Sequence, residues 1–483
     1  MQGSGENSAA RQLGQQLIQQ VLECAQFPFA DSDASVCKMP LKFFYDLALA
    51  LGDSDPQGYD LQDQGSSERL SASGRNAFVA LYSPIFLSLL DIIVVQIMIP
   101  EATILRNDKI SDEVVEMRSY WKDAVLDCCG VLGFDVCMSR LCGKLQEAVS
   151  LTDGQQMRYS IVESILFAIQ LISPWLPRDD DRYTPALIEF LGRLSAVDQL
   201  TYVQLTVIEL YGLLAFWFND HPQFLGPVMT KLFGDLSNVK VSAAASRTLM
   251  QILRQCRSVP GLPVTDLYGH IHKLRQSPSS AALSMEAELY LLEGIAVVIS
   301  SSDSNNQQLS AAASAEAFRS IVTPILLELR EAVPQLTAHP SALQTSSLIA
   351  NIDRLTVLFR FFRCSDSSCL VDLLVNLIPL FKQANAVLSS DRVAEHICRC
   401  YKHSIRNVGV NFLPYLPAFC QHLADEFALV PVAAYLYAGL LGTTEPFKLL
   451  NCVLFFSERN YRRVCCASFE GEGGRGRCIA LPI

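Results

Sequence analysis

Positive charge is scarce in this sequence. Lys and Arg together number 38 among 483 residues, against 49 Asp and Glu, so the formal net charge is −11. A chain with this balance is a poor general binder of nucleic-acid backbones, because its own charge repels their phosphates. It is better suited to basic partners. We therefore expect no direct contact with DNA or RNA.

Catalytic signatures are also missing. The sequence contains no G-x-S-x-G, no H-E-x-x-H, no phosphate-binding P-loop and no set of kinase motifs. Seven histidines leave few candidates for acid–base chemistry. We expect no enzymatic activity and no cofactor.

No secretory signal is visible, because residues 1–16 are polar, and we expect this segment to be disordered. The 16 cysteines stand at irregular spacing, several in doublets such as Cys128–Cys129. Irregular cysteines without a signal sequence are typical of reduced thiols inside the cell.

One long apolar run raises the question of a membrane. Phe78–Pro100 is long enough to span a bilayer. However, it contains Asp91, Gln96 and the pair Ser83–Pro84, its flanks are not strongly basic, and no second run of this kind occurs. Between a membrane span and a buried helix, we favour the buried helix and expect no membrane span.

The dominant pattern along the chain is helical. Apolar residues recur at three- and four-residue spacing in blocks separated by Pro, Gly, Ser, Asp or Asn. The blocks come in pairs, and the first helix of each pair is expected to begin near Ser111, Asp153, Gln199, Asn238, Ala281, Ser341, Asp391 and Pro431. Most of these steps lie near the roughly 40–47 residues of a HEAT or armadillo hairpin. We predict an all-α, right-handed α-solenoid of HEAT-type helical hairpins.

The solenoid is expected to occupy residues 17–456. It is interrupted by an acidic and Ser-rich insertion at 52–74 and by a polar insertion at 300–308. Residues 457–483 are rich in Gly and Arg and lose the helical periodicity, so we expect an irregular tail there. Because a solenoid ends in a capping repeat with a polar outer face, this tail suggests a truncated chain or foreign sequence at its end.

The most informative segment is Asp391–Gly409, where five residues share one helix face. They are Arg392, His396, Arg399, Lys402 and Arg406. At 100° per residue they form a stripe roughly 120° wide and about four turns long. Guanidinium groups make bidentate, charge-assisted contacts with phosphate, so the stripe suits an extended partner with repeated phosphates. An ordinary solvated basic face is the alternative.

Two other groups have the residue types of a metal site. His396, Cys400 and His403 fall on one helix face, and imidazole and thiolate are zinc ligands. They lack a fourth ligand, so we expect no metal there. The acidic run Asp179–Asp181 is more typical of a solvated loop than of a cation site.

Several segments resemble the transportin-3/importin-13 branch of the importin-β family. The strongest matches are NDHPQFLGPVM at Asn219–Met229 and the small-residue run SAAAS at Ser242–Ser246. Supporting matches are Cys37–Asp53, Met117–Gly133, Asp353–Phe362 and the helix that carries the stripe. The resemblance runs from about Leu17 to about Phe456. The stripe favours transportin-3 as the closer relative.

Members of this family are nuclear import receptors. The resemblance implies that the chain binds cargo in the cytoplasm, touches FG-repeat nucleoporins in the nuclear pore and releases cargo to Ran-GTP. It would then shuttle between nucleus and cytoplasm. In transportin-3 an arginine-bearing helix holds the phosphorylated Arg/Ser-rich region of splicing factors. The stripe matches that helix, with His396 and Lys402 where the family pattern has other cations.

The resemblance also implies that parts of the family chain are missing. The N-terminal repeats, which carry most Ran-GTP contacts, have no counterpart, so we expect those contacts to be absent. A HEAT-repeat scaffold for protein assembly, with no transport role, remains the alternative function.

Overall fold

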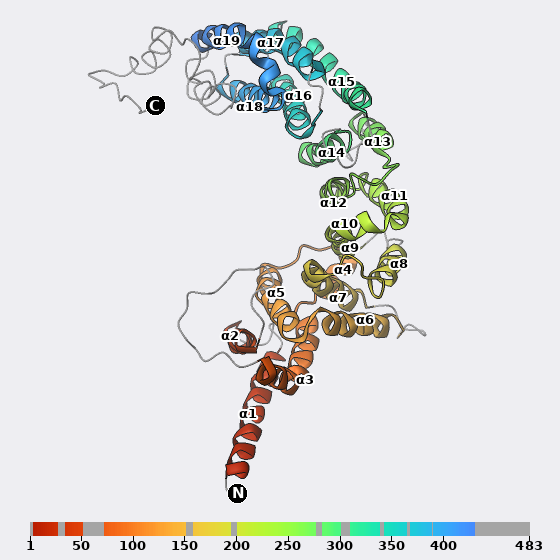
Figure 1. Cartoon of the computed structure of the whole chain (residues 1–483), viewed down its shortest axis with the longest axis vertical. Helices are drawn as coiled ribbons and strands as arrows, with labels where there is room; N and C mark the ends of the chain where they lie inside the picture. Colours follow the sequence, from red (N-terminus) through yellow and green to blue (C-terminus); the bar gives the residue numbers. More distant parts are fainter. Residues whose placement is uncertain are drawn as a thin grey trace, which may run out of the picture. The chain divides into compact units, whose positions relative to one another are not determined.

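The computed structural model describes residues 3–27, 34–51, 72–150, 158–194, 200–276, 283–300, 310–338, 342–364, 368–388 and 390–429. Every regular element within these ranges is a helix (Figure 1). The chain divides into two compact units, residues 1–248 and 249–483.

The first unit is built from paired helices. They are α1 (Gly3–Ala25), α2 (Ala34–Leu51), α3 (Ala72–Gln96), α4 (Glu101–Arg106), α5 (Asp112–Leu132), α6 (Phe134–Ser150), α7 (Tyr159–Ile172), α8 (Thr184–Leu194), α9 (Thr201–Leu213), α10 (Ala215–Asp220) and α11 (Leu225–Asp235). Helix α5 packs against α3 and α7, and α7 packs against α9. Helix α12 (Ser242–Gln255) begins in this unit and ends in the second.

The second unit repeats the arrangement in two layers. Its helices are α13 (Val264–Gln276), α14 (Met285–Val298), α15 (Ala311–Ala338), α16 (Ala342–Phe361), α17 (Ser368–Leu388), α18 (Asp391–Val408) and α19 (Leu416–Leu429). Helices α14, α16 and α18 contact one another in order and form one layer, while α15, α17 and α19 form the other (Figure 1). The cores of both layers are Leu, Ile, Val and Phe side chains with no exposed surface.

The predicted HEAT-type solenoid is confirmed. The first helices of the pairs begin at Asp112, Tyr159, Thr201, Ser242, Met285, Ala342 and Asp391, each within a few residues of the expected start. Pro431 lies outside the described residues. The local signals act as the sequence suggests, because the Ser111 and Ser284 side chains accept the backbone N–H groups of Val114 and Ala287 and thus cap α5 and α14.

Buried ion pairs join successive helices in both units. Glu163 on α7 is 1% exposed and receives two hydrogen bonds from Arg118 of α5, at 2.8 and 2.9 Å. Glu288 on α14 is 2% exposed and accepts from Arg354 of α16 at 2.8 Å through both oxygens. Arg275 of α13 lies 3.4 Å from the same carboxylate. These pairs compensate charge that burial alone would make very costly.

Some boundaries differ from the sequence expectation. Residues 3–16 form the first part of α1 rather than a disordered segment, because Ala, Gln, Arg and Leu are good helix formers. Nearly all of the insertion at 52–74 and of the polar insertion at 300–308 lies outside the described residues, as does the tail at 457–483.

Two helices have the length and composition to cross a membrane, Val79–Gln96 within α3 and Ser368–Leu388, which is α17. We had expected only the first. Such helices are weak evidence for a span, because the core helices of globular proteins satisfy the same criterion.

Candidate functional site

Helix α18 buries one face and presents another. Its buried residues are Val393, Ala394, Ile397, Cys398, Cys400, Tyr401, Ser404, Ile405 and Val408. The five apolar positions that we expected to pack are all among them. The helix ends at Gly409, whose φ of 63° favours glycine. Because the apolar residues are turned inward, the basic stripe is directed outward.

The structure divides the stripe into two parts. In the N-terminal part the cations have carboxylate partners: His396 Nδ1 lies 2.6 Å from Asp353 Oδ1 of α16, and Arg399 donates to Glu395 at 2.7 Å. In the C-terminal part, neither Lys402 nor Arg406 forms a salt bridge with any residue that the structure describes. Arg392 lies exposed in the first turn of the helix.

Two further arginines, from the end of α16, join the C-terminal part. Arg360 is exposed and lies over the Phe361 ring at 4.9 Å, and Arg363 follows two residues after the helix. The Asn407 side chain of α18 donates to the carbonyls of Phe359 and Phe362, at 2.9 and 2.6 Å, and so fixes the end of α16 against α18. Sequence reasoning had treated these arginines as an ordinary solvated pair.

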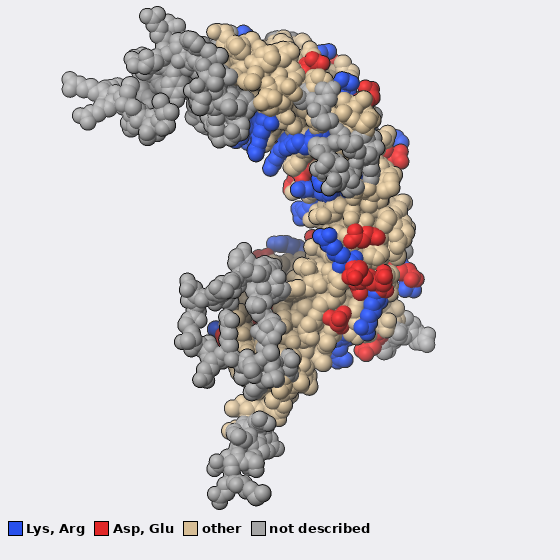
Figure 2. Space-filling view, in the orientation of Figure 1, with Lys and Arg blue, Asp and Glu red and all other residues tan. Residues whose placement is uncertain are grey.

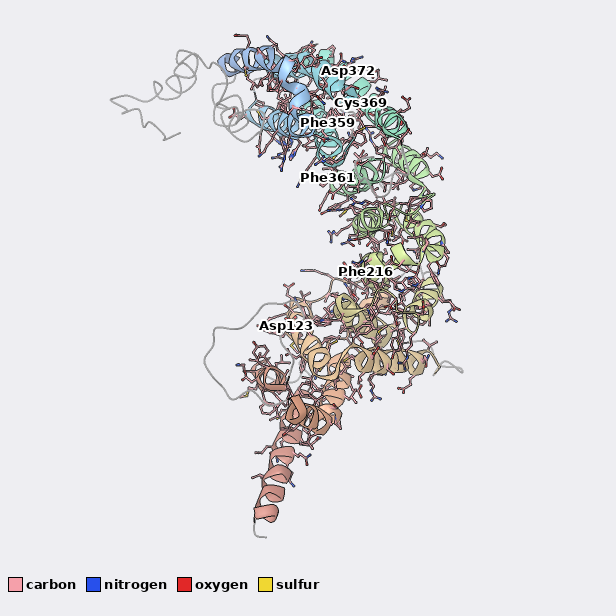
Figure 3. The ribbon with its side chains drawn as sticks, in the orientation of Figure 1. Asp123, Phe216, Phe359, Phe361, Cys369 and Asp372 are labelled. Atoms are coloured by element: carbon pink, nitrogen blue, oxygen red, sulfur yellow. The ribbon has the colours of Figure 1, made fainter. Side chains whose placement is uncertain are left out.

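We call Arg360, Arg363, Arg399, Lys402 and Arg406 the basic cluster. Figure 2 shows Lys and Arg side chains gathered on the edge of the second unit that α16 and α18 form. Figure 3 places Phe361 at this edge, whereas Phe359 of the same helix is fully buried. A concentrated group of cations in a chain of net charge −11 is the strongest local departure from its overall charge.

The electrostatics of the cluster are seen at His403. Burial, together with the positive charges of Arg360, Lys402, Arg406 and Arg399, lowers the pKa of His403 from 6.5 to about 4. The imidazole is therefore neutral at pH 7. Burial, and then the charge of Arg406, also lowers the pKa of Arg363. The cluster thus holds positive charges close enough to repel one another, which an anion would relieve.

The other two candidate sites have structural explanations. Cys400 is fully buried, burial raises the pKa of its thiol to about 12, and His396 is engaged with Asp353. Within the described ranges no group of three or more His, Cys, Asp or Glu is arranged to hold a metal ion. The Asp180 carboxylate accepts the Thr184 N–H at 2.8 Å and so caps the start of α8.

The first unit has a surface groove of different character. It has a volume of about 450 Å³ and lies between α3, α6 and the loop before α8. Arg140 and Lys144 line it, and both form salt bridges with Asp91 of α3. Because its cations are compensated in this way, the groove lacks the excess charge of the basic cluster.

Comparison with known proteins agrees with this architecture. The family profile described as the third TPR domain of transportin-3 and importin-13 matches residues 187–265. Importin-13 of Gallus gallus is 23% identical over 416 residues, which are 78% of this chain and 40% of that protein. The chain spans about two fifths of the length of the curated relatives it matches.

Solved structures share the fold. Importin-13 in its cytosolic state matches with a TM-score of 0.73 at 18% identity, covering 94% of this chain and 50% of that chain. A structure of Kap95p with RanGDP matches with a TM-score of 0.60 at 15% identity, covering 96% and 51%. The solved relatives are therefore importin solenoids of about twice this length.

The family profile covers the turn at Asn219–Met229 and the run at Ser242–Ser246, the two segments that carried the resemblance in the sequence. Whether transportin-3 is the closer relative stays a prediction. At low sequence identity, the chain belongs to the transportin-3/importin-13 branch of the importin-β family.

Proposed function

We propose that this chain acts as a nuclear import receptor, or as part of one, and binds protein cargo through the basic cluster. The importin relatives support transport as the class of function. The observation that carries the cargo site is the convergence of five cations from α16 and α18 around His403.

The chemistry of the cluster favours phosphate. A phosphoserine carries a charge of about −1.5 to −2 and three acceptor oxygens, so one group can pair with two cations at once. Arg406 and Lys402 are available for this, because no described carboxylate forms a salt bridge with them. Arg360 has its guanidinium against the Phe361 ring, which orients it without neutralising it.

The cargo class that this cluster suits is an Arg/Ser-rich segment in its phosphorylated form. The unphosphorylated segment is strongly basic, and the cluster would repel it. Phosphorylation reverses the charge of the segment and supplies repeated dianions along an extended chain. Affinity would then come from several charge-assisted contacts rather than from one deep pocket.

The remaining partners follow from the family. The Kap95p structure contains RanGDP, which supports Ran as a kind of partner. FG-repeat nucleoporins, Ran-GTP and shuttling between nucleus and cytoplasm are part of the same proposal for the whole receptor. Arg392 and His396 belong to the proposed cargo surface as its N-terminal end, where His396 is engaged with Asp353.

Fluorescence anisotropy with an Arg/Ser-repeat peptide tests the proposal. We expect the phosphorylated peptide to bind more tightly than the unphosphorylated one, and the double variant Arg399→Glu, Arg406→Glu to lose that difference. A matched control is Lys273→Glu, Arg319→Glu, which makes the same charge change on α13 and α15 of the other layer.

Equal binding of the two peptides, or equal loss in both double variants, would contradict the cargo site. The chain would then be better described as a HEAT-repeat scaffold with another partner.

A further inference from the structure

A single carboxylate interrupts the row of cations that leads to the basic cluster. Glu293 of α14 accepts a hydrogen bond from Arg254 of α12 at 2.9 Å. The positive charge of Arg360 on α16 also acts on it. Its side chain is 15% exposed, whereas that of Arg254 is 52% exposed. Glu293 thus stands between two arginines and reaches the surface.

Close packing of α12 and α14 produces this arrangement. Gly294, next to Glu293, lies so near α12 that a Cβ there would come within 2.8 Å of Leu253 Cδ1 and 3.2 Å of the Met250 Cα. The absence of a side chain at this position brings the neighbouring carboxylate beside Arg254. The position of Glu293 is therefore fixed by the backbone rather than by a mobile side chain alone.

The signs of charge follow an order across one layer. Arg254 lies on α12, Glu293 on α14, Arg360 on α16 and the other cations of the cluster on or beside α18. Packed helices stand about 8–10 Å apart, and an extended chain advances about 3.3–3.6 Å per residue. A partner crossing this layer would place roughly three residues on each helix, so different residues would face Glu293 and the α18 cations.

We propose that Glu293 is a specificity-determining residue of the cargo surface, and that it pairs with a basic residue of the bound segment. The inference rests on the proposed function. An Arg or Lys of the partner would meet the Glu293 carboxylate while its phosphates meet Arg360 and the α18 cations. The surface would then select a segment that carries both signs of charge over one that carries phosphates alone.

Electrostatic cost gives the selection its direction. A phosphate placed on α14 faces a carboxylate in the partly buried setting where like charges interact most unfavourably. A guanidinium in the same place makes a charge-assisted hydrogen bond. Glu293 is already paired with Arg254, so the partner's cation would share the carboxylate or displace that arginine.

Two peptides of equal net charge separate this from general attraction. One is a four-repeat Arg–phosphoserine peptide. In the other, Gln replaces each Arg and half of the phosphoserines are serine. Anisotropy would be measured for both with the wild-type chain, with Glu293→Gln and with Glu316→Gln. The last removes a carboxylate from an exposed pair on α15 and serves as the control.

We expect Glu293→Gln to weaken binding of the Arg-containing peptide by about fivefold, the range of one partly exposed ion pair, and to leave or strengthen binding of the Gln-containing peptide. Arg254→Gln, which frees the carboxylate, should strengthen binding of the Arg-containing peptide alone. Glu316→Gln should change neither.

If Glu293→Gln changes both affinities by the same factor, or if Arg254→Gln leaves the Arg-containing peptide unaffected, Glu293 does not set specificity, although the cargo site stands. If the wild-type chain does not distinguish phosphorylated from unphosphorylated Arg/Ser peptide, the proposed function fails and this inference fails with it. Circular dichroism of each variant would show that the helices are intact.

Discussion

Arg363 and Arg406 approach one another across the contact between α16 and α18, and the charge of Arg406 adds to burial in lowering the pKa of Arg363. Two like charges are held together here by forces that do not involve them. Asn407 binds the end of α16, and the buried faces of both helices pack together. The repulsion is a standing cost that a bound anion would reduce.

His403 should report on this charge directly. Replacing Arg406 by Gln removes one of the cations that lower its pKa, so that pKa should rise above about 4, while burial keeps it below 6.5. The histidine ring protons would be followed by NMR across pH 3.5–8. A control, Arg392→Gln, removes a cation that does not contribute to the shift. An unchanged His403 titration in Arg406→Gln would contradict the electrostatic description of the cluster.

The same shift predicts a pH dependence of stability. Between pH 6.5 and about 4 the unfolded chain protonates this histidine and the folded chain does not, so the free energy of unfolding should fall as the pH falls through that range. Urea unfolding of the wild-type chain and of His403→Gln should show the two curves converging above pH 7. A His403→Gln variant with the same pH dependence as wild type would rule out this contribution.

Asp127 should behave in the opposite sense. Burial, and then the charge of Asp123, raises the pKa of Asp127 from 3.8 to about 6. Figure 3 marks Asp123 on α5. The folded chain therefore holds the proton up to a higher pH, and the stability associated with it is lost as the pH rises through 6. Asp127→Asn should raise the free energy of unfolding by about 1 kcal/mol at pH 7.5, after allowance for solvent screening.

The gain from Asp127→Asn should vanish below pH 4, where both states are protonated. Asp123→Asn offers a second check, because it removes the like charge and should lower the pKa of Asp127. A loss of stability in Asp127→Asn at every pH would show that the carboxylate has a favourable partner.

Glu288 is expected to be the most sensitive charged residue of the second unit. It is 2% exposed and is the shared partner of Arg354 and Arg275. Glu288→Ala would leave both guanidinium groups without this carboxylate, at a cost of about 3 kcal/mol or more. In urea unfolding, the control Glu316→Ala, whose pair is exposed, should change stability by less than about 0.5 kcal/mol. Similar values for the two variants would contradict the argument.

Gly294 provides a test of close packing. Alanine is the better helix former by about 1 kcal/mol, yet a Cβ at this position would meet the backbone of Met250 at 3.2 Å and cannot be accommodated by a side-chain rotation alone. We expect Gly294→Ala to lower the free energy of unfolding by about 1–2 kcal/mol. Gly192→Ala on α8, where nothing lies within 4 Å, should instead raise it by up to about 1 kcal/mol.

The helical register could be predicted from the sequence because it depends on local signals. Asp391 was expected to begin a helix and does, and the outward face of α18 follows from the spacing of its basic residues. The expected copy of the Pro-containing turn at Ser320–Leu326 instead lies within α15, which continues through Pro324. There the packing of a long buried helix outweighs the local tendency of proline to end one.

The composition of the cargo surface could not be predicted in the same way. Arg360 and Arg363 are more than thirty residues from α18 in sequence, and only the packing of α16 on α18 makes them neighbours of Arg406. The pairing of His396 with Asp353 also depends on that packing, which reduces the number of cations free to meet a partner. Spacing along one helix identified the face, whereas the contact between helices decides its charge.

Asn407 has a consequence beyond holding one helix end. Its amide engages the carbonyls of Phe359 and Phe362, the next backbone N–H at Arg363 donates to the Ser300 hydroxyl, and that hydroxyl donates to Ala296 in α14. The C-terminal ends of α18, α16 and α14 are therefore linked in series, hydrogen bond by hydrogen bond. A tilt of any one end would load the next two, so this margin of the solenoid should respond as a single stiff beam, with amide protons that exchange together rather than helix by helix.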